Sequence, residues 1–75
     1  MDRTEFELLH DAYTIMHIVG ERSEAAQRAK RNVGQVLMGR VTPAQRAHLE
    51  NLAEKDRLNS GYTELLALAP LEVPA

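Results

Sequence analysis

The 75-residue chain contains no cysteine and no tryptophan, and its aromatic residues are only one phenylalanine and two tyrosines. Without cysteine, neither a disulfide framework nor a thiolate metal site can stabilise the fold. The scarcity of aromatic rings means that the core must be largely aliphatic. Because a chain of this length lies near the lower limit for an independent hydrophobic core, self-association is the expected source of additional stability.

Long hydrophobic runs are also missing from the sequence. The longest apolar clusters, such as IMHIV at 15–19, fall far short of the roughly 20 residues that span a bilayer. The N-terminal stretch MDRTEFELL is acidic, unlike the basic start of a secretory leader. We therefore expect a cytoplasmic protein that makes no contact with a membrane.

The composition favours an all-α fold. Alanine, leucine, glutamate, arginine and glutamine dominate, and no stretch alternates β-branched with polar residues over the length of a strand. Apolar residues follow a helical period from Leu8 to Leu37, and Asp2 or Thr4 supplies an N-terminal cap. We predict one long helix over about 4–38.

The end of this long helix is less well defined than its start. Gly39 fits the position just after a helix, where a left-handed residue often stands. Asn32 and Gly34 could end the helix earlier, so whether 32–41 is helix or loop stays open at this stage.

The strongest local signal in the sequence lies just beyond Gly39. Thr42 supplies an N-cap, Pro43 fits the first helical position, and Gln45 completes a T-x-x-Q capping box. We predict a second helix over about 43–59, with a kink or break near its end. The short connection makes it an antiparallel neighbour of the long helix.

The rest of the chain is expected to be a short helix over about 61–69 followed by an extended tail over 70–75. Pro70 and Pro74 restrict the tail to extended conformations. The whole chain, 1–75, is then a single helical-hairpin domain.

The apolar face of the first helix covers about half of its circumference, which is wider than one neighbouring helix can cover. Exposed apolar surface of this kind marks an interface. We therefore predict a homodimeric four-helix assembly, with a monomeric three-helix bundle as the alternative. The residues expected at the dimer or partner interface are Leu9, Tyr13, Met16, Val19, Tyr62, Leu65 and Leu66.

Charge is sharply segregated, although the net charge is only −2. Residues 22–46 carry six basic side chains and one acidic side chain, whereas 1–21 carry five acidic side chains and one basic. A basic hairpin end can bind nucleic-acid phosphates or an acidic partner, or it can simply complement the helix dipole. The candidate contact residues are Arg28, Lys30, Arg31, Arg40 and Arg46.

The sequence offers no support for catalysis, a metal or a cofactor. His10 and His17 share a helix face, but seven residues separate them by about 10 Å, too far to share one ion. That face lies opposite the apolar stripe, so we expect it to be solvated, and we expect His48 to be a partly buried structural histidine. The sequence also contains no phosphate-binding loop and no nucleophile elbow, so no small-molecule substrate is expected.

These features together suit a non-enzymatic protein that works by binding. We expect a small regulator or adaptor, and more specifically an inhibitor, that binds a larger protein through helical surfaces, of the kind that phages and mobile elements encode. The alternative function is a nucleic-acid-binding helical-hairpin dimer that uses the basic turn.

Overall fold

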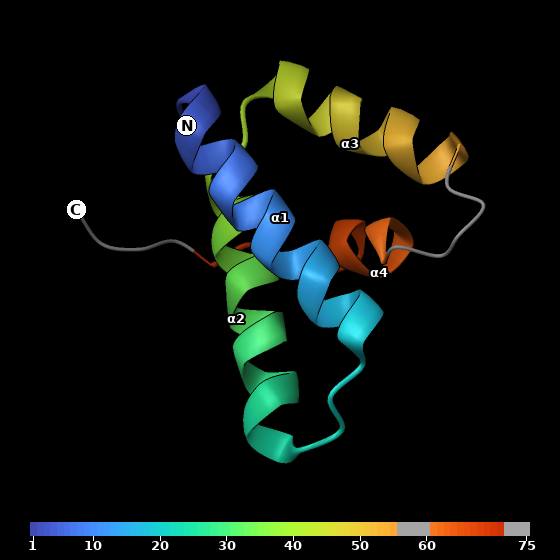
Figure 1. Cartoon of the computed structure of the whole chain (residues 1–75). Helices are drawn as coiled ribbons and strands as arrows, with labels where there is room; N and C mark the ends of the chain where they lie inside the picture. Colours follow the sequence, from blue (N-terminus) through green and yellow to red (C-terminus); the bar gives the residue numbers. More distant parts are fainter. Residues whose placement is uncertain (56–60, 72–75) are drawn as a thin grey trace.

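The computed structural model describes residues 1–55 and 61–71. Within these residues the fold is all-α, as predicted, and it consists of α1 (Arg3–Val19), α2 (Glu24–Arg40), α3 (Pro43–Lys55) and α4 (Tyr62–Leu66). Helices α1 and α2 lie side by side and run in opposite directions, α3 crosses one end of this pair, and α4 lies below α3 beside α1 (Figure 1).

The prediction of one continuous helix over 4–38 is wrong, because the chain turns between Val19 and Glu24. Gly20 ends α1 with φ +65° and ψ +33°, a left-handed conformation that carries no Cβ penalty in glycine. Ser23 then caps α2, and its side chain accepts a hydrogen bond of 3.1 Å from the backbone N–H of Ala26. The helical hairpin is therefore formed by α1 and α2.

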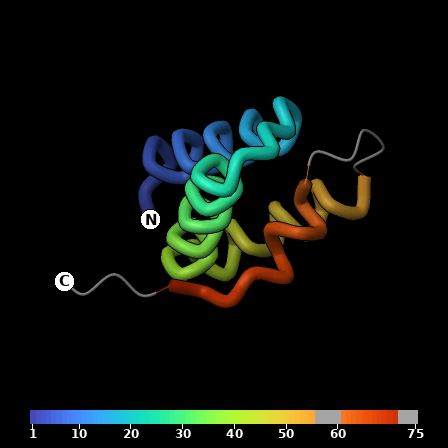
Figure 2. Tube along the Cα trace, turned by 90° about the horizontal axis from the view of Figure 1, so that it is seen from below, coloured from blue at the N-terminus to red at the C-terminus, as the bar shows by residue number. Residues whose placement is uncertain are grey.

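The prediction that Gly39 stands just after a helix is also wrong, since α2 continues to Arg40 and the range 32–41 is almost entirely helical. Gly39 instead allows the C-terminal segment to approach, because an added Cβ would collide with the backbone oxygen of Leu71. The N–H of Leu71 donates to the carbonyl of Gln35 at 3.0 Å. Figure 2 shows this segment passing beside the C-terminal half of α2.

The predicted start of α3 is confirmed. The backbone N–H of Thr42 donates to Gln45 Oε1 at 2.9 Å, and the N–H of Gln45 donates to Thr42 Oγ1 at 3.1 Å. This is the reciprocal pattern of a capping box. The described part of α3 ends at Lys55, and the kink or break predicted near its end falls outside the described residues.

Helix α4 is shorter than the predicted helix over 61–69. It ends at Leu66, and the N–H of Ala67 already turns back to the carbonyls of Glu64 and Leu65. Every helix nevertheless contributes to one small core, so α4 belongs to the folded domain. The core residues are Phe6, Tyr13, Leu37, Met38, Leu49 and Leu65.

Candidate functional sites

An apolar stripe lies exposed along α1. The side chains of Leu8, Ile15 and Val19 are 66%, 59% and 69% exposed. Together with Ala12 they follow a spacing of four, three and four residues, which places them within an arc of about 60° on the helix. The same spacing forms the seam of paired helices in coiled coils. We call these four residues the α1 stripe.

Neighbouring helices cover the side of α1 opposite the stripe and leave the stripe itself open. Leu9 and Met16, which lie about 80–100° from Leu8 around the helix, are partly buried. His10 and His17 lie on the side that meets α4. The apolar face of α1 is thus wider than the other helices of the same chain cover. The sequence predicted such an uncovered apolar surface on the first helix.

A shallow groove of about 310 Å³ runs between the stripe and α2. Its walls are apolar: Ile15, Met16 and Val19 line one side, and Ala26 and Ala29 line the other. Small alanines on α2 leave room above them, so a large apolar side chain from another helix can enter the groove. Three polar residues complete its lining, namely Glu21, Gln27 and Lys30.

The structure divides the predicted interface residues into three groups. Val19 is exposed, whereas Leu9, Met16, Tyr62 and Leu66 are partly buried. Tyr13 and Leu65 are only 2% and 0% exposed and belong to the core, so placing them at an interface was wrong. Both were placed at an interface because no local pattern in the sequence reports which faces of α1, α2 and α4 pack together.

Two residues of the exposed stripe were not among the predicted interface residues. Leu8 and Ile15 follow the same helical period as Val19, so the spacing along the sequence was sufficient to include them.

Lys30, one of the five predicted basic contacts, is held inside the fold. Its Nζ donates to Nδ1 of His17 at 2.8 Å and lies 3.3 Å from a carboxylate oxygen of Glu64. The same ammonium lies 5.4 Å from the centre of the Tyr13 ring. With its side chain only 15% exposed, Lys30 joins α1, α2 and α4 and is poorly placed for an external anion.

The other four basic residues differ in their pairing. Arg40 forms an ion pair of 2.9 Å with Glu5, and Arg46 lies 3.7 Å from Glu50 on the same helix. Arg28 and Arg31 are exposed and form no ion pair with a described residue. The basic stretch is therefore largely balanced within the chain.

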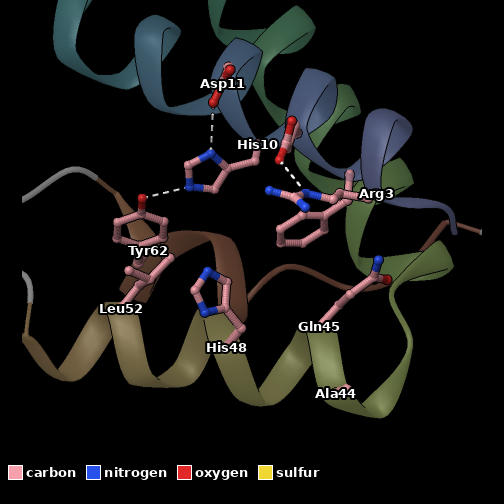
Figure 3. Close-up of a pocket in the computed structure, with 10 residues that line it drawn as sticks. Arg3, His10, Asp11, Ala44, Gln45, His48, Leu52 and Tyr62 are labelled. Carbon is pink, nitrogen blue, oxygen red and sulfur yellow. Dashed lines mark hydrogen bonds and ion pairs between the residues drawn. The ribbon is translucent and has the colours of Figure 1, made fainter.

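A cleft of about 640 Å³ lies on the opposite side of α1, between α1, α3 and α4. Figure 3 shows Arg3, His10 and Asp11 reaching it from α1, His48 and Leu52 from α3, and Tyr62 from α4. The remaining lining residues are Phe6, Glu7, Ala44 and Gln45. We call this feature the aromatic cleft.

Rings form one wall of the aromatic cleft. The ring of His10 lies 6.0 Å from that of Phe6 and 5.4 Å from that of Tyr62, measured between centroids. The plane of His10 is tilted by 27° from that of Phe6 and by 26° from that of Tyr62, so His10 stacks on both rings. His48 faces Phe6 at 6.3 Å with a tilt of 56°.

Hydrogen bonds fix the orientation of the His10 ring. Its Nδ1 lies 3.0 Å from Asp11 Oδ1, and its Nε2 lies 2.6 Å from the hydroxyl oxygen of Tyr62. Because a carboxylate only accepts, a neutral His10 carries its proton on Nδ1, and Nε2 then accepts from the Tyr62 hydroxyl.

The expectation of a solvated face for His10 and His17 is wrong, since their side chains are only 21% and 13% exposed. Helix α4 covers them, and Gly61 lies so close to His17 that an added Cβ would be 2.6 Å from its Cγ. The prediction for His48 was wrong in the other direction, because this residue is exposed. The sequence could not place α4 over this side of α1.

Neither a metal site nor a membrane-spanning helix is found in 1–55 and 61–71. Among these residues no three histidine or carboxylate side chains are grouped closely enough to hold an ion. No helix in the same ranges is long and apolar enough to cross a membrane.

Comparison of the chain with protein-family models, with curated proteins and with solved structures finds no match. Its function has to be argued from the α1 stripe, the groove and the aromatic cleft.

Proposed function

We propose that this chain is a small non-enzymatic regulatory protein that forms a homodimer and acts by binding a larger protein. The observation that carries the proposal is the α1 stripe, whose three large side chains are about two-thirds exposed. Exposed apolar residues that are aligned along one helix face mark a protein interface more often than isolated ones do. A second helix that covers the stripe would remove these side chains from water.

The stripe and its groove are complementary to a second copy of themselves. The groove lies at the C-terminal half of α1, beside Ile15 and Val19, and Leu8 projects from the N-terminal half of the same stripe. When two α1 helices pack in opposite directions, Leu8 of each copy meets the groove of the other. A two-fold axis produces this reciprocal contact, in which residue i meets j and j meets i.

The side chain of Ile18 stays exposed in the proposed dimer and can contact another protein. It is 70% exposed, and the helix period places it about 80° from Leu8, outside the stripe. In the dimer, Ile18 would lie beside the seam and supply apolar contact to the larger partner.

Nucleic-acid binding is the second candidate function, and it depends on Arg28 and Arg31. These are the basic residues of the predicted set that no described carboxylate neutralises. With Arg22, they make three exposed arginines among the described residues that pair with no described carboxylate, which is a small electrostatic footprint even when a dimer doubles it. Protein binding is therefore favoured over nucleic-acid binding.

The absence of cysteine from the sequence makes the seam directly testable by disulfide cross-linking. We expect the double variant Leu8→Cys, Val19→Cys to form covalent dimers on mild oxidation, because the two positions face each other across the axis. Within one chain they are separated by about 16 Å of helix, which is too far for a disulfide. The single variant Leu8→Cys is the matched control and should stay largely monomeric on a non-reducing gel.

Two results would contradict this arrangement. Covalent dimers of Leu8→Cys alone would indicate parallel helices. If the double variant formed no covalent dimer, the seam would be excluded.

The role of Ile18 is tested by using the tagged chain to capture binding partners. The tagged Ile18→Glu variant should still form the dimer but should no longer capture the larger protein. Captured material that disappears on nuclease treatment, and in an Arg28→Gln, Arg31→Gln variant, would favour the nucleic-acid function instead.

A further inference from the structure

We infer that the aromatic cleft binds a small planar aromatic carboxylate. The volume of about 640 Å³ lies within the range of small-molecule sites, which is about 300–1,000 Å³. The cleft combines the apolar side chain of Leu52, a set of stacked rings, and two side chains, Arg3 and His48, that can donate hydrogen bonds to a ligand. It lies on the side of α1 away from the α1 stripe, so it remains open in the proposed dimer.

The row of rings favours a flat ligand. His10 stacks on both Phe6 and Tyr62, with tilts of 27° and 26° and centroid separations of 6.0 and 5.4 Å. Offset stacking at ring separations of about 4.5–7 Å is the preferred geometry for aromatic groups. A planar ring entering the cleft would extend this row, with Leu52 as its apolar support from α3.

The wall is already ordered before a ligand arrives. His10 is held at both nitrogens, by Asp11 on one side and by Tyr62 on the other. A ring fixed in this way loses little conformational freedom on binding, which favours affinity. The hydrogen bond between His10 and Tyr62 also joins α1 to α4, and the contact between Phe6 and His48 brings α3 to the same cleft.

Arg3 and His48 supply recognition of the carboxylate. Arg3 uses its Nε for Glu7 at 3.0 Å, and its two terminal nitrogens donate to no described residue. His48 is exposed, and its ring contacts only Phe6 among the described residues. In Figure 3 both side chains lie beside the cavity.

The two carboxylates that line the cleft do not oppose this assignment. Glu7 is already bonded to Arg3 and Asp11 to His10, and their side chains are 58% and 68% exposed, at the solvent edge. Solvent screens the charges of Glu7 and Asp11, and it also screens Arg3, whose side chain is 91% exposed. The ligand carboxylate is therefore held by direct hydrogen bonds from Arg3 and His48, not by the net charge of the cleft. The sequence indicated no small-molecule substrate, and the cleft is assigned as a binding site with no reaction.

The test is a titration of the full chain, labelled with ¹⁵N, followed by NMR. The probe is indole-3-acetate, and the comparison ligands are cyclohexaneacetate, which has the same charge without a planar ring, and indole, which has no charge. We expect saturable amide shifts that concentrate on residues of the cleft, with indole-3-acetate binding at least several-fold more tightly than either comparison ligand.

Variants separate the cleft from general surface binding. Arg3→Gln should weaken indole-3-acetate binding about tenfold, since one charge-assisted hydrogen bond is lost. Ala44→Phe, at an exposed lining position, should block the cleft without disturbing the core. Arg28→Gln is the matched control and should bind as the parent does.

Three outcomes would overturn the inference. These are shifts that centre on the groove beside Ile15, equal binding of indole-3-acetate and cyclohexaneacetate, or the absence of saturable shifts at millimolar ligand. Equal loss of affinity in Arg3→Gln and Arg28→Gln would also overturn it, because binding would then depend on overall charge alone.

Discussion

The ring of Tyr13 packs directly against Gly34, and a Cβ added at Gly34 would lie only 2.9 Å from Cε2 of that ring. The same added atom would collide with a methyl group of Leu68. Glycine in the middle of α2 therefore allows α1 and the segment after α4 to approach the helix closely.

Gly34→Ala should destabilise the protein despite the better helix propensity of alanine. Overpacking costs about 1–3 kcal/mol, against a gain of about 1 kcal/mol from replacing a helical glycine. Urea unfolding should report a net loss of up to about 2 kcal/mol. Asn32→Ala, at an exposed position of the same helix, is the control and should be neutral or stabilising. If Gly34→Ala and Asn32→Ala stabilised the protein equally, Tyr13 would not pack against Gly34.

The stability of the fold should fall at alkaline pH because of Tyr13. Burial, and secondarily the negative charge of Glu64, raises the pKa of Tyr13 from 10.0 to about 12. Above pH 10 the unfolded chain loses the phenolic proton while the folded chain retains it, so ionisation favours the unfolded state. Stability is therefore unaffected below pH 10 and decreases as the pH rises from 10 towards 12.

The full alkaline loss is expected to be no more than about 2–3 kcal/mol, because a shift of one pKa unit corresponds to about 1.4 kcal/mol. Unfolding by urea at pH 9 and pH 11 measures it, with Tyr13→Phe as the control for other groups that titrate in this range. The parent should lose more stability than Tyr13→Phe between the two pH values. The same loss in both proteins would contradict the burial of the phenol.

The turn between α1 and α2 is tested by Gly20→Ala. A left-handed conformation costs a residue with a Cβ about 1 kcal/mol, so this variant should melt at a lower temperature than the parent. If α1 and α2 instead formed one continuous helix, alanine would raise the melting temperature. The sign of the change thus distinguishes the two structures.

Thr42→Ala should destabilise the protein by about 1 kcal/mol, because the capping hydrogen bond to the N–H of Gln45 is lost. Pro43→Ala should cost less, since proline at this position contributes only a fixed backbone angle. Thermal melts of the two variants beside the parent provide the comparison. A fully stable Thr42→Ala protein would place the start of α3 elsewhere.

Features set by neighbouring residues were predictable from the sequence. The all-α class follows from composition, and the start of α3 follows from the capping box of Thr42 and Gln45. The break at Gly20 was missed although Gly20 and Ser23 both signal it. Val19 and Ala26 are seven residues apart, so the apolar period continues across the turn in nearly the same phase and imitates one helix.

Features that join distant parts of the chain were not predictable. Arg40 pairs with Glu5, and Lys30 is enclosed by His17 and Glu64, so two of the candidate basic contacts are used within the fold. No local pattern reports such pairs, which depend on how the helices pack. The aromatic cleft was missed for the same reason, because its lining comes from three helices.

Sedimentation equilibrium tests the central claim, which is that the α1 stripe joins two copies of the chain. We predict a dimer for the parent and a folded monomer for Ile15→Glu, because a charge in the apolar seam opposes association while position 15 is exposed in the single chain. Ile18→Glu introduces the same charge outside the stripe and should remain a dimer. A parent that stays monomeric at high concentration, or an Ile15→Glu variant that dimerises as tightly as the parent, would contradict the claim.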